Sequence, residues 1–209
     1  WPPPPILALF LDIVVHRDLS QQLLALLNGL AIAHLLNLTL VLPEMSAHYE
    51  SAMYEGQDLQ ALEFDPSPIH RIAMDQVFDT DALRAAVAPW VQVVDALPKH
   101  LQGDAAFSRI LASEVDPLRP HTLQPYLSAM RDRLVLRVKS PVSSVVWSTP
   151  HLGQLRKAAV SALAPGAAVA PVVAGRLREI QALAARQAVP GYIALHLRAE
   201  ADWASYCRE

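Results

Sequence analysis

The stretch that decides the fold reads ILALFLDIVV (residues 6–15), HRDLS (16–20), QQLLALLNGLAIAHLL (21–36) and NLTLVLP (37–43). The first run is rich in apolar and β-branched residues and predicts a buried strand. The third run repeats apolar residues at helical spacing and predicts a helix, with Ser20 as its N-cap and Asn37 as its stop. Residues 39–42 predict a second buried strand that ends at Pro43.

Strand, loop, helix and strand in this order make a βαβ unit, whose strands are parallel and joined by a right-handed crossover. Ligands of parallel sheets bind at the carboxyl ends of the strands, often against a helix N-terminus. We therefore expect a binding loop at residues 16–22.

Further along the chain, helical patterns alternate with apolar runs, which is typical of α/β domains. The pattern predicts helices at residues 81–87 (capped by Thr80), 107–114, 126–133, 152–163 and 176–187, and strands at 90–94, 134–138, 142–147 and 192–197. Residues 164–174 show no periodicity and predict a loop or an extended stretch. The sequence thus predicts an α/β fold, with a Rossmann-like parallel sheet and flanking helices.

The composition excludes several classes of protein. Of 209 residues, 53% are hydrophobic and 18% are charged, so the chain can bury a large core and is not disordered. A net charge of −3 gives no general attraction for nucleic acid, and we expect no nucleic-acid partner. The run at 6–15 contains Asp12 and is too short to span a bilayer, and it lacks the basic flank of a signal peptide.

Cys207 is the single cysteine, so no disulfide can form within these 209 residues. Either its partner lies in another segment or chain, or the thiol stays unpaired. The eight histidines show no spacing typical of metal ligands, and no P-loop or Gly-x-Gly-x-x-Gly motif occurs. We therefore expect neither a metal site nor a bound cofactor.

His196-Leu-Arg198 stands at the carboxyl end of the predicted strand 192–197, where open α/β sheets bind ligands. Arginine offers a permanent positive charge and a forked donor that matches phosphate or carboxylate. The alternative is a structural ion pair of Arg198 with Glu200 or Asp202, and the residues by themselves leave both interpretations open.

The run YIALHLR (192–198) is followed by Glu200, Asp202, Trp203 and Cys207, and together they resemble the His-Leu-Arg motif of the protein O-fucosyltransferases. Residues 23–43 are similar to the first helix and the following strand of the same family. The resemblance implies a GT-B glycosyltransferase, in which Arg198 contacts the phosphates of GDP-fucose, His196 holds the loop and Asp202 helps to bind the nucleotide.

The family's first binding loop is matched by DLSQQ (18–22). Gln22 is retained, Ser20 and Gln21 replace the family's Gly and Asn, and Arg17 is shifted by one residue. Serine lacks the conformational freedom with which glycine lets a ligand approach the backbone closely. By resemblance, Arg17, Gln21 and Gln22 belong to the binding site.

The resemblance also implies a division of the chain. Residues 1–187 would form the N-terminal, acceptor-side half of a GT-B fold, and residues 188–209 the first strand and loop of an incomplete donor-side domain. The family's later motifs are absent from the 209 residues. Either further polypeptide or a second chain completes the fold, or the chain is a non-catalytic, binding or structural domain.

The implied activity is inverting transfer of fucose from GDP-fucose to Ser or Thr of a protein acceptor, or to a glycan, in the ER or Golgi lumen. No metal is required if Arg198 neutralises the leaving diphosphate. Glu44 follows the second strand and is a candidate base, although a solvated loop carboxylate is the plainer interpretation. Asn37-Leu-Thr39 is either an N-glycosylation sequon or a coincidental Asn-x-Thr turn.

Overall fold

The computed structural model describes residues 10–15, 19–46, 71–131, 133–139, 141 and 145–186. The chain divides into two compact units, Trp1–Val169 and Ala170–Glu209. In the second unit the described residues form one helix, α7 (Ala170–Arg186), with an ion pair between Arg176 and Glu179 (Nη1–Oε2, 2.8 Å). The predicted domain boundary between residues 187 and 188 lies outside the described residues and stays a prediction.

The first unit is built on a five-stranded parallel sheet in the order β5-β2-β1-β7-β6. Its strands are β1 (Phe10–Val14), β2 (Thr39–Val41), β5 (Val93–Val94), β6 (Phe107–Leu111) and β7 (Val135–Lys139). A separate antiparallel pair joins β3 (Met45–Ser46) to β4 (Arg71–Ile72). Strand β2, which follows β1 in the chain, pairs with one edge of β1, and the much later strand β7 pairs with its other edge. Strand β1 therefore lies at a topological switch point. The predicted α/β, Rossmann-like sheet is confirmed.

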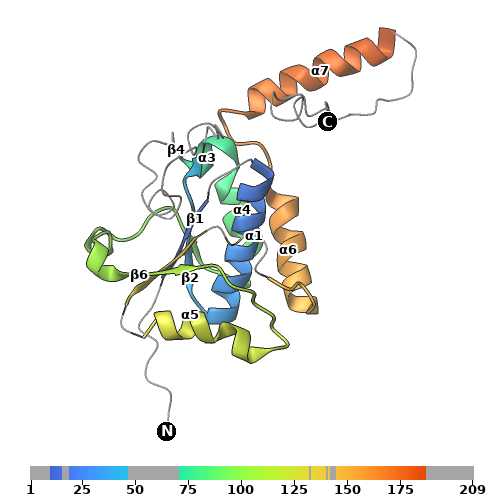
Figure 1. Ribbon diagram of the computed structural model, residues 1–209. Helices are drawn as coiled ribbons and strands as arrows, with labels where there is room; N and C mark the ends of the chain where they lie inside the picture. Colours follow the sequence, from blue (N-terminus) through green and yellow to red (C-terminus); the bar gives the residue numbers. More distant parts are fainter. Residues whose placement is uncertain are drawn as a thin grey trace, which may run out of the picture. The chain divides into compact units, whose positions relative to one another are not determined.

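The helices of this unit lie mainly on one side of the sheet (Figure 1). They are α1 (Leu19–Leu36), α3 (Met74–Val77), α4 (Thr80–Val87), α5 (Gln124–Ala129) and α6 (Pro150–Ala162), with short 3₁₀ helices at Lys99–Leu101, Asp104–Ala106 and Pro120–Leu123. Helix α6 packs against both α1 and α4. The main hydrophobic core therefore lies between these helices and one face of the sheet.

Helix α1 is the central helix of that core. It approaches β1 so closely that a Cβ at Gly29 would lie 2.9 Å from the Ile13 Cδ1 atom. Buried Asn28 donates from Nδ2 to the Pro141 carbonyl (2.5 Å) and accepts from the Trp147 indole N–H (3.1 Å). By length and composition α1 could cross a membrane, but 61% of it is buried inside the fold, as expected of a core helix.

The end of α1 follows the prediction, and its start does not. Asn37 ends the helix with φ 53°, while Leu38 N–H donates to the Ala33 carbonyl (2.8 Å) and Asn37 N–H to that of His34 (3.3 Å). The helix already includes Leu19, so Ser20 lies inside its first turn and is not the N-cap. Residues 19–22 therefore belong to the helix and not to the predicted loop, because a helical period does not mark where the first turn begins.

Three other predictions are wrong. Residues 107–111 form strand β6 and not a helix, because register pairing with β7 supplies backbone hydrogen bonds that a local pattern cannot reveal. The N-cap of α4 is Asp79, whose Oδ1 accepts from Ala82 N–H (2.9 Å), while Thr80 is buried. Residues 170–174, predicted to be non-helical, form the first turns of α7.

Four further predictions agree in type and differ in extent. Helices α5 and α6 and strand β7 are confirmed within a few residues, and the strand predicted at 90–94 shortens to Val93–Val94. Within the described part of 142–147, Val145 makes an isolated bridge to Val115. The strand predicted at 192–197 lies outside the described residues.

Candidate functional site

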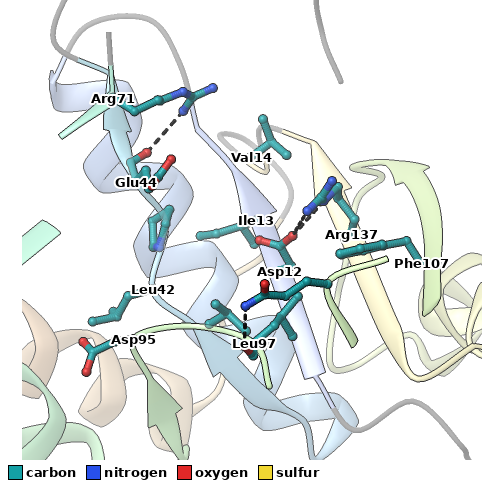
Figure 2. A pocket seen from close by; sticks show the side chains of 13 residues that line it. Asp12, Ile13, Val14, Leu42, Glu44, Arg71, Asp95, Leu97, Phe107 and Arg137 are labelled. Atoms are coloured by element: carbon teal, nitrogen blue, oxygen red, sulfur yellow. Dashed lines mark hydrogen bonds and ion pairs between the residues drawn. The ribbon is translucent and has the colours of Figure 1, made fainter. Parts of the chain in front are cut away.

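A cavity of about 290 Å³ opens at the carboxyl ends of β1, β2 and β5 (Figure 2). Its wall combines apolar strand residues with charged side chains from five segments of the chain. The charged and polar lining residues are Asp12, Glu44, Arg71, Asp95, Gln102 and Arg137. The cavity thus lies where parallel α/β sheets bind ligands, and next to the switch point at β1.

An ion pair between neighbouring strands forms one wall. Asp12 and Arg137 are register partners on β1 and β7, and the Arg137 Nε and Nη2 atoms lie 2.7 Å and 2.6 Å from Asp12 Oδ2. The guanidinium also stacks on the Phe107 ring, 4.0 Å from its centroid. Both charged side chains are largely buried, at 14% and 23% exposed. Three contacts therefore hold Arg137 in one orientation toward the cavity, as Figure 2 shows.

The opposite side of the cavity is closed by Arg71, which reaches across from β4. Its Nη1 donates to the Val15 carbonyl (2.8 Å) and to the Glu44 carbonyl (3.2 Å). These carbonyls follow the carboxyl ends of β1 and β2. Arg71 therefore ties the two strand ends together and places a permanent positive charge beside them.

The cavity carboxylates differ in their surroundings. Asp12 is paired with Arg137, and Asp95 forms an ion pair with Arg84, which also binds Asp81. Glu44 is exposed, and within the described part of the chain its carboxylate is in no ion pair. Glu44 is thus the cavity carboxylate that is available to accept a proton or a hydrogen bond from a ligand.

This arrangement suits a polar ligand with hydroxyl groups. Two arginines place permanent positive charges on the wall, and one exposed carboxylate offers an acceptor. Among the described residues, no group of three or more His, Cys, Asp or Glu side chains could hold a metal ion. The charged and polar side chains of the wall support recognition by hydrogen bonds and charge.

Of the residues that the sequence offered for the site, the structure describes Glu44, which lines the cavity, and two glutamines. Gln21 and Gln22 lie in the first turn of α1, just after the carboxyl end of β1, and Gln22 is 2% exposed. Neither of these two glutamines lines the cavity. Arg17, His196, Arg198 and Asp202 lie outside the described residues. The binding roles of all six stay predictions.

Sequence reasoning did not identify Asp12, Arg71 or Arg137 as members of a site. A weak signal was available for Asp12 and Arg137. Each interrupts an otherwise apolar strand, and a charge in a buried strand needs a partner. For Arg71 no local pattern existed, because its contacts join segments that are 27 and 56 residues apart in sequence.

Comparison with known proteins gives a likeness of fold. No protein-family model and no curated protein sequence matches the chain. Among solved structures it is similar to the apo form of POFUT1 (13% identity, TM-score 0.55, covering 97% of this chain and 62% of that one). It is also similar to POFUT1 in complex with GDP, in two crystals (14% identity, TM-scores 0.51 and 0.52, covering 97% and 95% of this chain and 61% and 62% of those). The chain thus spans about three fifths of these structures and shares a glycosyltransferase-like fold with them.

Proposed function

We propose that this chain is part of a fucosyltransferase that transfers fucose from GDP-fucose to the hydroxyl group of Ser or Thr in a protein acceptor, with inversion. The observation that carries the proposal is the likeness of its fold to POFUT1, including POFUT1 in complex with GDP. The motif His196-Leu-Arg198 supports it independently, because it was identified from sequence as similar to the fucosyltransferase motif.

The donor side of the proposed site is assigned to the C-terminal segment. As the diphosphate leaves, negative charge grows on its oxygen atoms, and a preorganised guanidinium stabilises that charge directly. We assign this role to Arg198, with His196 and Asp202 holding the loop and the nucleotide. Because Arg198 supplies the positive charge, we propose that transfer needs no metal ion and survives treatment with a chelator.

The acceptor side is assigned to the cavity. In an inverting transfer, the acceptor oxygen forms a bond to the sugar C1 atom while the bond from C1 to the diphosphate oxygen breaks on the opposite face. The hydroxyl proton must pass to a base. We assign the base to Glu44, since Asp12 and Asp95 are each held by an arginine. Arg17, Gln21 and Gln22 stay assigned to the binding site by resemblance alone, and neither glutamine lines this cavity.

The structures that resemble this chain are longer than it, so the proposal concerns a site completed by a donor-side domain. That domain would come from further polypeptide or from a second chain. The test should therefore begin with binding, which needs fewer parts of the site than transfer does.

Calorimetric titration of GDP and GDP-fucose into wild type and Arg198→Ala tests the donor assignment. We expect micromolar binding by wild type and a loss of about 100-fold or more in the variant, as for a charged hydrogen bond to phosphate. Arg186→Ala, which removes an exposed arginine of α7, is the matched control and should bind as wild type does. If folded wild type binds neither ligand, the chain is an incomplete or a non-catalytic glycosyltransferase-like domain. The changed residues in Ser20-Gln21-Gln22 also favour the non-catalytic alternative.

A further inference from the structure

The proposed reaction assigns no role to Arg71, although this arginine lines the same cavity as the proposed base Glu44. From β4, its Nη1 atom donates to the main-chain carbonyls of Val15 (2.8 Å) and Glu44 (3.2 Å), and Figure 2 shows the second of these bonds. Val15 is buried just after β1, the middle strand of the sheet, and Glu44 follows β2. One guanidinium therefore fastens the segment that carries the base to the end of the middle strand.

The main chain around Glu44 is held on both sides. Before it, Leu42 N–H donates to the Val94 carbonyl (2.8 Å), and after it, Met45 pairs with β4 and is 2% exposed. The Glu44 side chain is exposed, and within the described residues its carboxylate is in no ion pair. The place of this carboxylate in the cavity therefore depends on its main chain, and Arg71 holds that main chain directly.

Placement of this kind matters because proton transfer depends steeply on distance. A base must lie within about 2.6–3.2 Å of the atom whose proton it takes, and a displacement of about 1 Å can cost about 100-fold in rate. An arginine suits this task, since its guanidinium is planar, always charged and offers its donors in a rigid fork. The charge also strengthens its hydrogen bonds to the two carbonyls.

We propose that Arg71 is a positioning residue for the transfer reaction. It holds the main chain of Glu44 against the end of β1, so that the carboxylate meets the acceptor hydroxyl at hydrogen-bond distance. Arg71 acts through Glu44 and takes up no proton itself. This inference rests on the proposed function, and it makes the antiparallel pair of β3 and β4 a part of the acceptor site.

The test is a double-mutant cycle, measured as transfer to an acceptor peptide by the enzyme with its donor-side domain. Arg71→Met removes the charge and the donors, and we expect kcat to fall by about 10-fold or more. The KM for GDP-fucose should stay unchanged, and Arg71→Lys, which keeps a charged donor, should recover part of the loss. In Glu44→Gln, adding Arg71→Met should change kcat by less than about twofold, because no base is left to position.

Arg133→Met is the matched control. Arg133 also donates from Nη1 to a main-chain carbonyl, that of Ala105 (2.8 Å), but it does not line the cavity, so this variant should transfer as wild type does. If the losses of Arg71→Met and Glu44→Gln multiply, or if Arg71→Met transfers as wild type does, the inference is wrong and the proposed function stands.

Two further outcomes are distinguishable from these. If Arg71→Met does not fold, the same cycle is measured with Arg71→Lys, whose smaller loss should likewise disappear in Glu44→Gln. A wild type that transfers no fucose would overturn the proposed function and this inference together.

Discussion

At the scale of single residues, the cavity carboxylates differ in their partners: Asp12 and Asp95 form ion pairs with arginines. Glu44 is exposed and has no ion pair within the described residues, so Glu44→Gln should remove the proton acceptor and leave the fold intact. We expect transfer to an acceptor peptide to fall by about 100-fold or more, with unchanged affinity for GDP. Glu114→Gln, a 60% exposed carboxylate outside the cavity, is the control. Wild-type transfer by Glu44→Gln would assign the proton to another base.

Tyr126 gives the fold a dependence on alkaline pH. Its hydroxyl is buried, donates to the Ser113 carbonyl (2.7 Å) and accepts from Ser113 N–H (3.0 Å). Burial raises the pKa of this hydroxyl above its ordinary value of 10.0, more than hydrogen bonds to Ser113 lower it. Folding therefore favours the neutral form of the Tyr126 hydroxyl. Its contribution to the free energy of unfolding is fully present below pH 10 and is lost as the pH rises through the pKa of the folded state.

Urea unfolding of wild type and Tyr126→Phe at about pH 7.5 and about pH 10.5 measures that contribution. We expect Tyr126→Phe to cost about 1 kcal/mol at the lower pH, and the difference between the two proteins to shrink at the higher pH. Lysines and the other tyrosines titrate in both proteins and cancel in the comparison. A difference that stays constant with pH would show that the Tyr126 hydroxyl does not titrate differently in the folded state.

At the scale of elements, the segment after α6 docks against α3 through backbone contacts. Gly166 N–H donates to the Val77 carbonyl (2.8 Å), and a Cβ at Gly166 would lie 2.6 Å from the Asp75 carbonyl oxygen. Backbone atoms cannot rotate away, so Gly166→Ala should lower the free energy of unfolding by about 1–3 kcal/mol.

The matched variant lies in α6, where a Cβ at Gly153 would meet nothing within 4 Å. Gly153→Ala should raise the free energy of unfolding by up to about 1 kcal/mol, since alanine favours a helix over glycine. Urea midpoints of the two variants, compared with wild type, check both signs. Equal effects of the two substitutions would contradict the tight docking at Gly166.

At the scale of the whole molecule, the sheet and both hydrophobic clusters lie within residues 1–169. This unit should therefore fold without residues 170–209. We expect a 1–169 fragment to unfold cooperatively, with a midpoint within about 3 °C of the full chain, a change of roughly 1 kcal/mol. If Arg198 belongs to the donor site, the fragment should also lose GDP binding. A fragment that unfolds without cooperativity would show that the C-terminal unit supports the first one.

Elements whose signals are local could be predicted from the sequence alone. The apolar run at 10–14, the helical period of α1, its stop at Asn37 and the return to an apolar strand all lie within about thirty residues, so a βαβ unit could be predicted from them. Helix α6 and strand β7 were predictable for the same reason. The edge of the sheet at which the cavity opens could be predicted too, because parallel strands put their carboxyl ends at one edge.

The tertiary structure alone decided which residues meet at that edge. Asp12 and Arg137 are 125 residues apart in sequence, and only the pairing of β1 with β7 brings them into register. Strand β6 likewise exists through its pairing with β7, since its local pattern also fits a helix. Strand pairing and long-range ion pairs join positions that share no local signal, so a single sequence carries no pattern from which they could be predicted.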